Sequence, residues 1–275
     1  MSQPPSAAPP GPGGGDPVAG LLRVVAQARP GADAGLIRRA YEVAARWHQG
    51  QLRKSGEPYI THPLAVATIL AETGADDDTL CAAMLHDTIE YTPCTLAALS
   101  CEFDAGIVSV VAEAAALEQI KGRPGRKKAL AMAAAKSADT RVLAVKLAHR
   151  LHNMRTVQFI PQAKQLRKAR ESLDIFVPVA AQLSLDEIEA ELETLAYATM
   201  KRNRHARSAP GRLLVAAAAL LPAGTRARWC QEWLGELHTL PARRDRARFA
   251  IQTTLGIPRL AITVRLPAPG RRRSG

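Results

Sequence analysis

The sequence has few aromatic residues and few cysteines. Phe, Trp and Tyr make up 4% of its 275 residues; strands are enriched in aromatic and β-branched side chains, so an all-β fold is disfavoured. The 4 cysteines include no Cys-x-x-Cys pair, which argues against a disulfide framework. No apolar run approaches the roughly 20 residues that span a bilayer, and no basic stretch followed by an apolar run opens the chain. We therefore expect a reduced, cytoplasmic protein.

Acidic residues are scarce in the last part of the chain. Residues 201–275 hold 16 Lys and Arg against 3 Asp and Glu, a net charge of +13, whereas residues 1–200 hold 21 against 22, a net charge of −1. Such a basic extension can contact nucleic acid, an anionic lipid surface or an acidic partner, or it can simply be solvated. We predict no specific nucleic acid ligand, and the oligomeric state stays open.

Alanine and leucine are abundant and indicate packed helices. Apolar residues first recur at helical spacing from Leu36 to Trp47. We predict an all-α protein with a disordered segment at residues 1–20, rich in Pro and Gly, a helical domain at 34–200 and a basic, partly helical C-terminal extension at 201–275. Further helices are expected at about 61–73, 77–90, 95–103, 106–119, 126–137, 139–154, 162–183 and 184–200. Ser184 and Glu187 have the spacing of a capping box for the last of these.

The extension opens with a basic linker at residues 201–210. An apolar run at 213–221 and helices at about 225–238 and 243–256 are expected after it. Apolar residues among many arginines, such as Trp229 and Trp233, are typical of basic amphipathic helices that bind anionic membranes or a partner. We favour the alternative that they fold back on the helical domain.

Three segments place imidazole or carboxylate groups in apolar helices: Thr61-His62-Pro63, His86-Asp87-Thr88-Ile89-Glu90, and residues 146–155, KLAHRLHNMR. Because lone buried charges are costly, these groups need a partner, a metal or a substrate. A His-Asp tandem, a His from a neighbouring helix and one later ligand make a mixed nitrogen and oxygen site that suits Mn²⁺ or Fe²⁺. Such a metal activates water, and Glu90, on the same helix face, can take the proton.

Each part alone has a structural interpretation. A single His-Asp dipeptide is weak support for a site, His62 by itself is more often a capping or packing residue, and His48 and His152 by themselves are more often structural. The combination and its order favour function.

Several segments resemble the hydrolase domain of the RelA/SpoT alarmone enzymes. They are HQGQLRKSGEPYITHPLAVATILAE from His48, AAMLHDTIE at 82–90, KLAHRLHNMRT at 146–156, ESLDIFVPVAAQL at 171–183 and ELETLAY at 191–197. The resemblance implies an all-α HD fold that binds one Mn²⁺ and removes pyrophosphate from the ribose 3′ position of ppGpp and pppGpp. The chain of 275 residues has no room for the synthetase domain of the long enzymes as well, so we expect a stand-alone hydrolase type.

The resemblance also implies roles for individual residues. They are metal ligation by His62, His86 and Asp87; catalysis by Glu90, which acts on the attacking water, and by Asn153; and nucleotide binding by Arg53, Lys54, Ser55, Asn153 and Thr156.

Two positions depart from the family. His149 stands where the fourth metal ligand is normally Asp, and Tyr91 stands where a second acidic residue normally follows Glu90. An imidazole at 149 can still bind a transition metal, but it favours Fe²⁺, Zn²⁺ or Ni²⁺ over Mn²⁺. Tyr91 cannot act as a carboxylate base near neutral pH, although Asp139 or Glu171 could replace a lost carboxylate if the fold brings it near.

Two interpretations therefore stay open. The favoured one is a pyrophosphohydrolase of guanine nucleotide alarmones. The alternative is a degenerate HD domain that binds a guanine nucleotide or a partner without turnover, and hydrolysis of another phosphorylated substrate is a lesser possibility.

Overall fold

The computed structural model describes residues 16–119, 139–206 and 208–265. The predicted all-α fold is confirmed: these residues form helices, and their one β-bridge, between Leu52 and Pro58, is isolated. The predicted helix at 126–137 lies outside the described residues. By contacts the chain divides into two units, residues 1–156 with 170–194, and residues 157–169 with 195–275.

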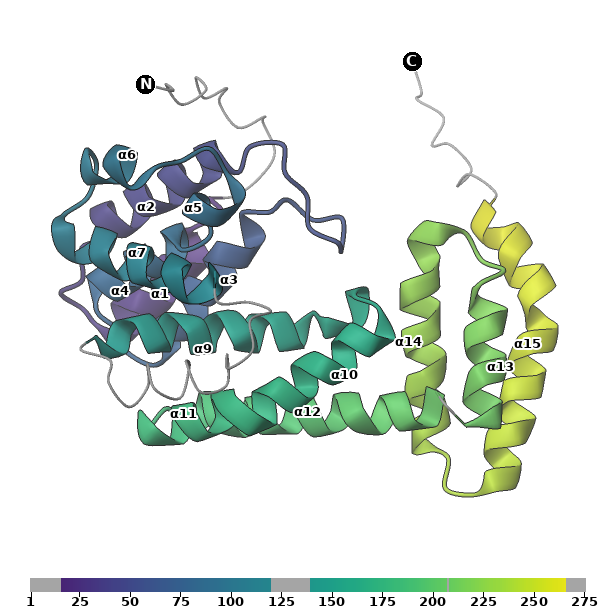
Figure 1. Cartoon of the computed structure of the whole chain (residues 1–275). Helices are drawn as coiled ribbons and strands as arrows, with labels where there is room; N and C mark the ends of the chain where they lie inside the picture. Colours follow the sequence, from purple (N-terminus) through teal and green to yellow (C-terminus); the bar gives the residue numbers. More distant parts are fainter. Residues whose placement is uncertain (1–15, 120–138, 207, 266–275) are drawn as a thin grey trace, which may run out of the picture. The chain divides into compact units, whose positions relative to one another are not determined.

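The first unit is built around helix α4 (Asp77–Leu85), which Figure 1 labels among the other helices of this unit. Helix α4 packs against α2 (Ala34–Trp47), α3 (Thr61–Glu72), α7 (Ala105–Gln119) and α9 (Thr140–Arg155). Residues 79–85 are all buried, as expected of a helix that is covered on every side. The other helical segments of this unit are α1 (Ala19–Ala28), α5 (Thr88–Tyr91), α6 (Leu96–Ser100), the end of α10 (Gln162–Glu171), the π-helix η2 (Ser172–Phe176), α11 (Val177–Gln182) and the first part of α12 (Asp186–Ala206).

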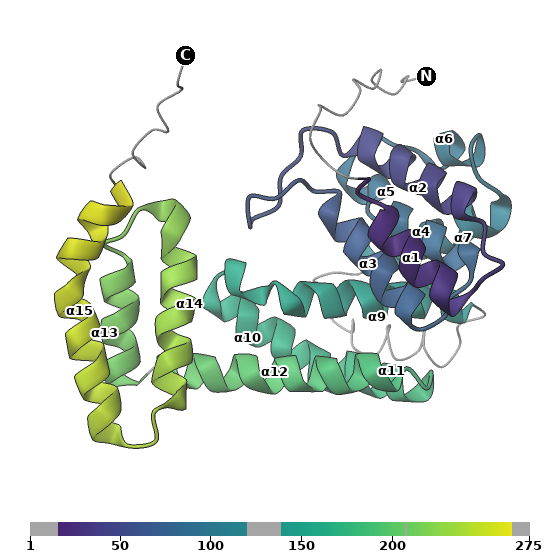
Figure 2. The same cartoon turned by 180° about the vertical axis from the view of Figure 1, so that it is seen from behind.

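Helix α1 was not predicted. It packs against α3 (Figure 2), and Val18, Leu21 and Val25 are buried. The prediction of disorder is therefore wrong for residues 16–20, whereas residues 1–15 lie outside the described part of the chain. The prediction rested on the Pro- and Gly-rich composition of residues 1–20 and overlooked the apolar helix face that begins at Val18.

The helix predicted over 77–90 is interrupted at His86 and Asp87. The His86 ring nitrogen Nδ1 lies 2.7 Å from the carbonyl oxygen of Ala83, and the Thr88 hydroxyl donates to the carbonyl of Leu85 at 2.7 Å. These side chains compete with the backbone for the last carbonyls of α4. The break turns both His86 and Asp87 toward one point.

Ser184 does not cap the helix that follows it. Its φ is +54°, and the amide of Leu185 donates to the carbonyl of Ala180. This is the arrangement that ends a helix through a left-handed residue. The predicted capping box is therefore wrong, and helix α12 begins two residues later (Asp186–Ala206).

The second unit contains η1 (Val157–Phe159), most of α10 (Gln162–Glu171), the end of α12, and the helices α13 (Ala209–Ala218), α14 (Ala223–Thr239) and α15 (Arg243–Arg265). Helix α12 continues to Ala206 and so covers most of residues 201–210. The prediction of a linker there is therefore wrong. The apolar faces of α13, α14 and α15 pack against each other around Leu214, Trp233 and Leu237. Trp233 and Leu237 are thus buried within the packing of these three helices, whereas Ile251 on α15 is exposed. No helix in the described ranges is long and apolar enough to cross a membrane.

Candidate metal centre

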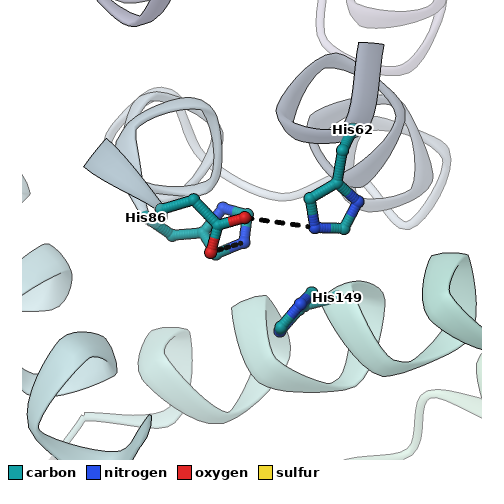
Figure 3. A group of neighbouring side chains, drawn as sticks. His62, His86 and His149 are labelled. Atoms are coloured by element: carbon teal, nitrogen blue, oxygen red, sulfur yellow. Dashed lines mark ion pairs between the residues drawn. The ribbon is translucent and has the colours of Figure 1, made fainter. Parts of the chain in front are cut away.

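Four side chains from three packed helices converge in the first unit (Figure 3). His62 lies in the first turn of α3, His86 and Asp87 lie at the break after α4, and His149 lies within α9. One donor atom from each of the four lies within 4.8 Å of the others. His62, His86 and Asp87 are buried and His149 is partly exposed. The structure thus brings together all four residues proposed as metal ligands.

The proton on His86 is placed by its neighbour. A carbonyl oxygen only accepts, so Nδ1 of His86 carries the hydrogen that it donates to Ala83. In the neutral form, which is the one that binds a metal, the lone pair of this ring is therefore on Nε2. Nε2 is buried without a hydrogen-bond partner in the described structure. This atom lies 3.1 Å from the Asp87 carboxylate oxygen Oδ1. Two acceptors that face each other at this distance favour a cation between them.

The proton on His62 follows from a chain of three residues. A nitrogen of the Arg53 guanidinium lies 3.1 Å from Nδ1 of His152, and the same Nδ1 lies 2.7 Å from Nδ1 of His62. A guanidinium can only donate, so Nδ1 of His152 is an acceptor and Nδ1 of His62 must be the donor. Nε2 of His62 is then left with its lone pair, 3.4 Å from Oδ2 of Asp87. Outer residues of this kind orient the ligands of a metal site.

The charge states suit metal binding. Burial pushes the pKa values of His62 and His149 well below the usual value for histidine. Burial opposes ionisation of Asp87, but the surrounding imidazoles, His86 first, hold the pKa of its carboxyl group well below its usual range. Neutral imidazole and ionised carboxylate are the forms that bind a metal.

Tyr59 supports the carboxylate from the other side. Its hydroxyl donates to Oδ2 of Asp87 at 2.8 Å, and its ring stacks on His48 with centroids 4.5 Å apart. Burial raises the pKa of the Tyr59 phenol, which keeps its proton available for this bond. His48, whose Nδ1 lies 2.9 Å from Oε1 of Gln51, therefore has a packing role.

These donors fit a divalent metal ion. Two Nε2 lone pairs, a third imidazole and one ionised carboxylate form a set richer in nitrogen than in oxygen. Such a set suits Fe²⁺ or Zn²⁺ better than Mn²⁺. The chain does not itself identify the metal.

The predicted nucleotide loop is a tight hairpin. The amide of Tyr59 donates to the carbonyl of Gln51, and Gly56 has the positive φ of +90° that the turn requires. Of the three loop residues proposed to bind nucleotide, Arg53 reaches the end of α9, where a guanidinium nitrogen lies 3.5 Å from the Thr156 hydroxyl. Lys54 is exposed, and the Ser55 hydroxyl donates to Glu57.

The remaining predicted site residues lie on α5 and α9. Glu90 is exposed on α5, one turn after Asp87. The Tyr91 phenol has a raised pKa because of burial and a hydrogen bond with Glu90. Asn153 is half-buried on α9, one turn after His149.

Neither acidic residue suggested as a replacement ligand joins this site. Asp139 caps α9 and pairs with Arg141 at 2.7 Å, and Glu171 pairs with Arg150 at 3.1 Å. Neither belongs to the donor cluster found in the described part of the chain. The hypothesis that one of them substitutes for a lost carboxylate is therefore wrong.

Two residues with a role at the site were not predicted, Tyr59 and His152. His152 was interpreted as a structural residue, but its Nδ1 forms a hydrogen bond with Nδ1 of His62. The spacing of His149 and His152, three residues apart on one helix, was the available signal, because such residues share a helix face.

The fold and the cluster are those of an HD domain. Residues 40–185, more than half of the chain, match a family model described as "HD domain", and the chain belongs to this family.

Its relatives are RelA/SpoT enzymes. The chain is 46% identical over 191 residues to the bifunctional (p)ppGpp synthase/hydrolase RelA of Mycobacterium tuberculosis, a match that covers 67% of this chain and 25% of that protein. It is 44% identical over 174 residues to the bifunctional (p)ppGpp synthase/hydrolase SpoT of Escherichia coli, covering 62% and 25%. It is 46% identical over 185 residues to a GTP pyrophosphokinase of Streptomyces coelicolor, covering 66% and 22%. The chain thus spans about a quarter of the length of these relatives.

Proposed function

We propose that this chain is a metal-dependent pyrophosphohydrolase of ppGpp and pppGpp, which yields GDP or GTP and pyrophosphate. The observation that carries the proposal is the donor cluster together with the Arg53 side chain, which is tied to ligand His62 through His152. This nearness of a guanidinium to the donor cluster supports the proposal, because phosphate pairs with a cation. The names of the RelA and SpoT relatives supply the substrate class.

The chemistry divides among the residues as follows. A divalent metal held by His62, His86, Asp87 and His149 would supply Lewis-acid activation of water and of a phosphoryl oxygen. Water replaces the ribose 3′ oxygen at phosphorus, Glu90 accepts the proton of the water, and the 3′ oxygen leaves as a hydroxyl group after protonation.

The other proposed residues bind the nucleotide. Arg53 and Lys54 are the cations for the phosphate groups, and the fork of Arg53 suits two phosphate oxygens at once. Ser55, Asn153 and Thr156 offer hydrogen bonds to the rest of the nucleotide. We expect Fe²⁺ or Zn²⁺ to support turnover better than Mn²⁺, because His149 replaces a carboxylate.

A second function is favoured by one specific observation. Tyr91 stands beside Glu90 and hydrogen-bonds to it, so the carboxylate proposed as the base is partly engaged. In this alternative, the chain binds the alarmone in a regulatory role without hydrolysing it.

The test is the release of pyrophosphate from ppGpp by the purified chain with Mn²⁺, Fe²⁺ or Zn²⁺. Asp87→Asn is the loss-of-ligand control, and the double variant His149→Asp with Tyr91→Asp restores both acidic positions. Release by the wild type that Asp87→Asn abolishes supports the enzyme. Release by the double variant alone supports the regulatory alternative. Equilibrium dialysis measures ppGpp binding directly. If neither the wild type nor the double variant binds ppGpp, both the enzyme and the regulatory alternative are contradicted.

A further inference from the structure

The second unit contains a cavity that is lined by apolar side chains, several amides and one arginine, and that shares no residue with the metal centre. Its volume is about 200 Å³, and it lies among η1, α10, α12, α13 and α14. This is room for several waters or one small organic anion. The polar residues that line it are mostly carboxamides, with one arginine: Gln158, Gln162, Gln165, Gln231, Asn203 and Arg202.

Among the described residues, Arg202 has no counterion. It makes no hydrogen bond and no ion pair with any described residue, and the cavity lining contains no Asp or Glu. Burial lowers the pKa of this guanidinium. A partly buried charge without a partner is unfavourable, and a guanidinium pairs best with an oxyanion through parallel hydrogen bonds.

The amides beside Arg202 are held in fixed orientations. The Asn203 side-chain nitrogen donates to Oε1 of Gln165 at 3.2 Å and to the carbonyl of Thr199 at 2.8 Å. The Gln165 nitrogen donates to the carbonyl of Ile160 at 2.8 Å. The buried Oδ1 of Asn203 is left without a donor. The cavity therefore combines a cation that has no partner among the described residues with two amide side chains held in fixed orientations.

We propose that this cavity binds a small oxyanion, a phosphate or carboxylate group bearing a hydroxyl. The negative oxygens pair with Arg202, and the remaining polar group of the ligand contacts the amide wall. Six of the nine lining residues belong to the segment 201–275, which is strongly basic in sequence, with a net charge of +13. The inference does not rest on the function proposed for the metal centre.

The chain provides its own reporters. Trp229 and Trp233 flank two cavity residues on α14, Cys230 and Gln231, and the two rings lie 5.8 Å apart. The third tryptophan, Trp47, is on α2 in the first unit, so Trp47→Phe leaves only the two reporters. The full chain in this background, with a chelator present, is titrated with inorganic phosphate or with malate. Sodium chloride of matched ionic strength is the reference.

The expected result is a saturable fluorescence change with phosphate, with malate or with both; the active probe identifies the class of oxyanion. Arg202→Gln should weaken binding about tenfold or more, since it removes a charged hydrogen-bond donor. Arg202→Lys should bind with intermediate affinity, and Arg204→Gln, an exposed position two residues away, should bind as the parent chain does.

A second readout needs no substitution. Ligand should slow alkylation of Cys230 by iodoacetamide, measured by mass spectrometry, but should not slow alkylation of the exposed Cys101. The proposal is overturned if both probes act only as chloride does, or if Arg202→Gln binds as tightly as Arg204→Gln. It is also overturned if Cys230 is not protected at a concentration that saturates the fluorescence.

Discussion

The bond between His152 and His62 is the most testable detail of the metal centre. His62 is 2% exposed, and its Nδ1 hydrogen has the His152 acceptor 2.7 Å away. His152→Leu removes that acceptor and leaves a buried donor unsatisfied, which costs about 1–3 kcal/mol. It also frees the His62 ring to turn its Nε2 away from the site. Loss of such an outer partner typically lowers metal affinity about tenfold to a hundredfold.

The matched variant is His152→Asn, because an asparagine oxygen can take the place of the imidazole Nδ1 as an acceptor. We expect His152→Asn to keep most of the metal affinity that His152→Leu loses. Metal affinity is measured by letting the protein compete with a chromophoric chelator for Co²⁺. The free energy of unfolding is measured by urea denaturation of the metal-free chain.

Two results would refute this reasoning. If His152→Leu binds Co²⁺ as tightly as the wild type, the orientation of His62 does not depend on the bond. If His152→Asn and His152→Leu lose affinity equally, the imidazole acts through its shape rather than as an acceptor.

Three further predictions concern pH, metal choice and stability. Burial, followed by the charge of Arg53, lowers the pKa of His152 from 6.5 to about 4. The unfolded chain therefore binds the extra proton first, and the metal-free protein should lose stability as the pH falls from about 6.5 to about 4, by ~3 kcal/mol from this group; urea unfolding across this range, with no loss found, would contradict it. His149→Asp should raise the affinity for Mn²⁺ relative to Zn²⁺, and an unchanged ratio of the two dissociation constants would count against His149 as a ligand. Arg150→Met should lower the free energy of unfolding by about 3 kcal/mol, because the buried guanidinium pairs with Glu171 at 3.1 Å and stacks on a phenylalanine ring. The exposed Arg228→Met should change it by less than about 1 kcal/mol, and similar losses in both variants would show that the Arg150 pair is not special.

Local patterns were enough to predict the helical class and the segments that carry the donor cluster. Periodic apolar residues predicted most helices, because the 3.6-residue period depends only on the sequence of one segment. Imidazole and carboxylate groups in apolar helices pointed to the three segments that hold His62, His86, Asp87 and His149, since such groups are rarely buried without a partner. The resemblance to the RelA/SpoT hydrolase domain then implied which of their residues are ligands. The structure brings these four together, while their binding of a metal stays a prediction.

Contacts between distant segments decided the rest. The bonds from Arg53 to His152 and from Tyr59 to Asp87 join residues 99 and 28 positions apart, and no local pattern specifies such pairs. The pairing of Asp139 and Glu171 with arginines, which keeps both out of the site, likewise depends on what the folded chain places beside them. The sequence by itself determined which residues could act as ligands, because this is a matter of side-chain chemistry. Only the tertiary structure decided which nitrogen of His62 and His86 faces the site, because each proton is placed by a hydrogen-bond partner that folding brings to the ring.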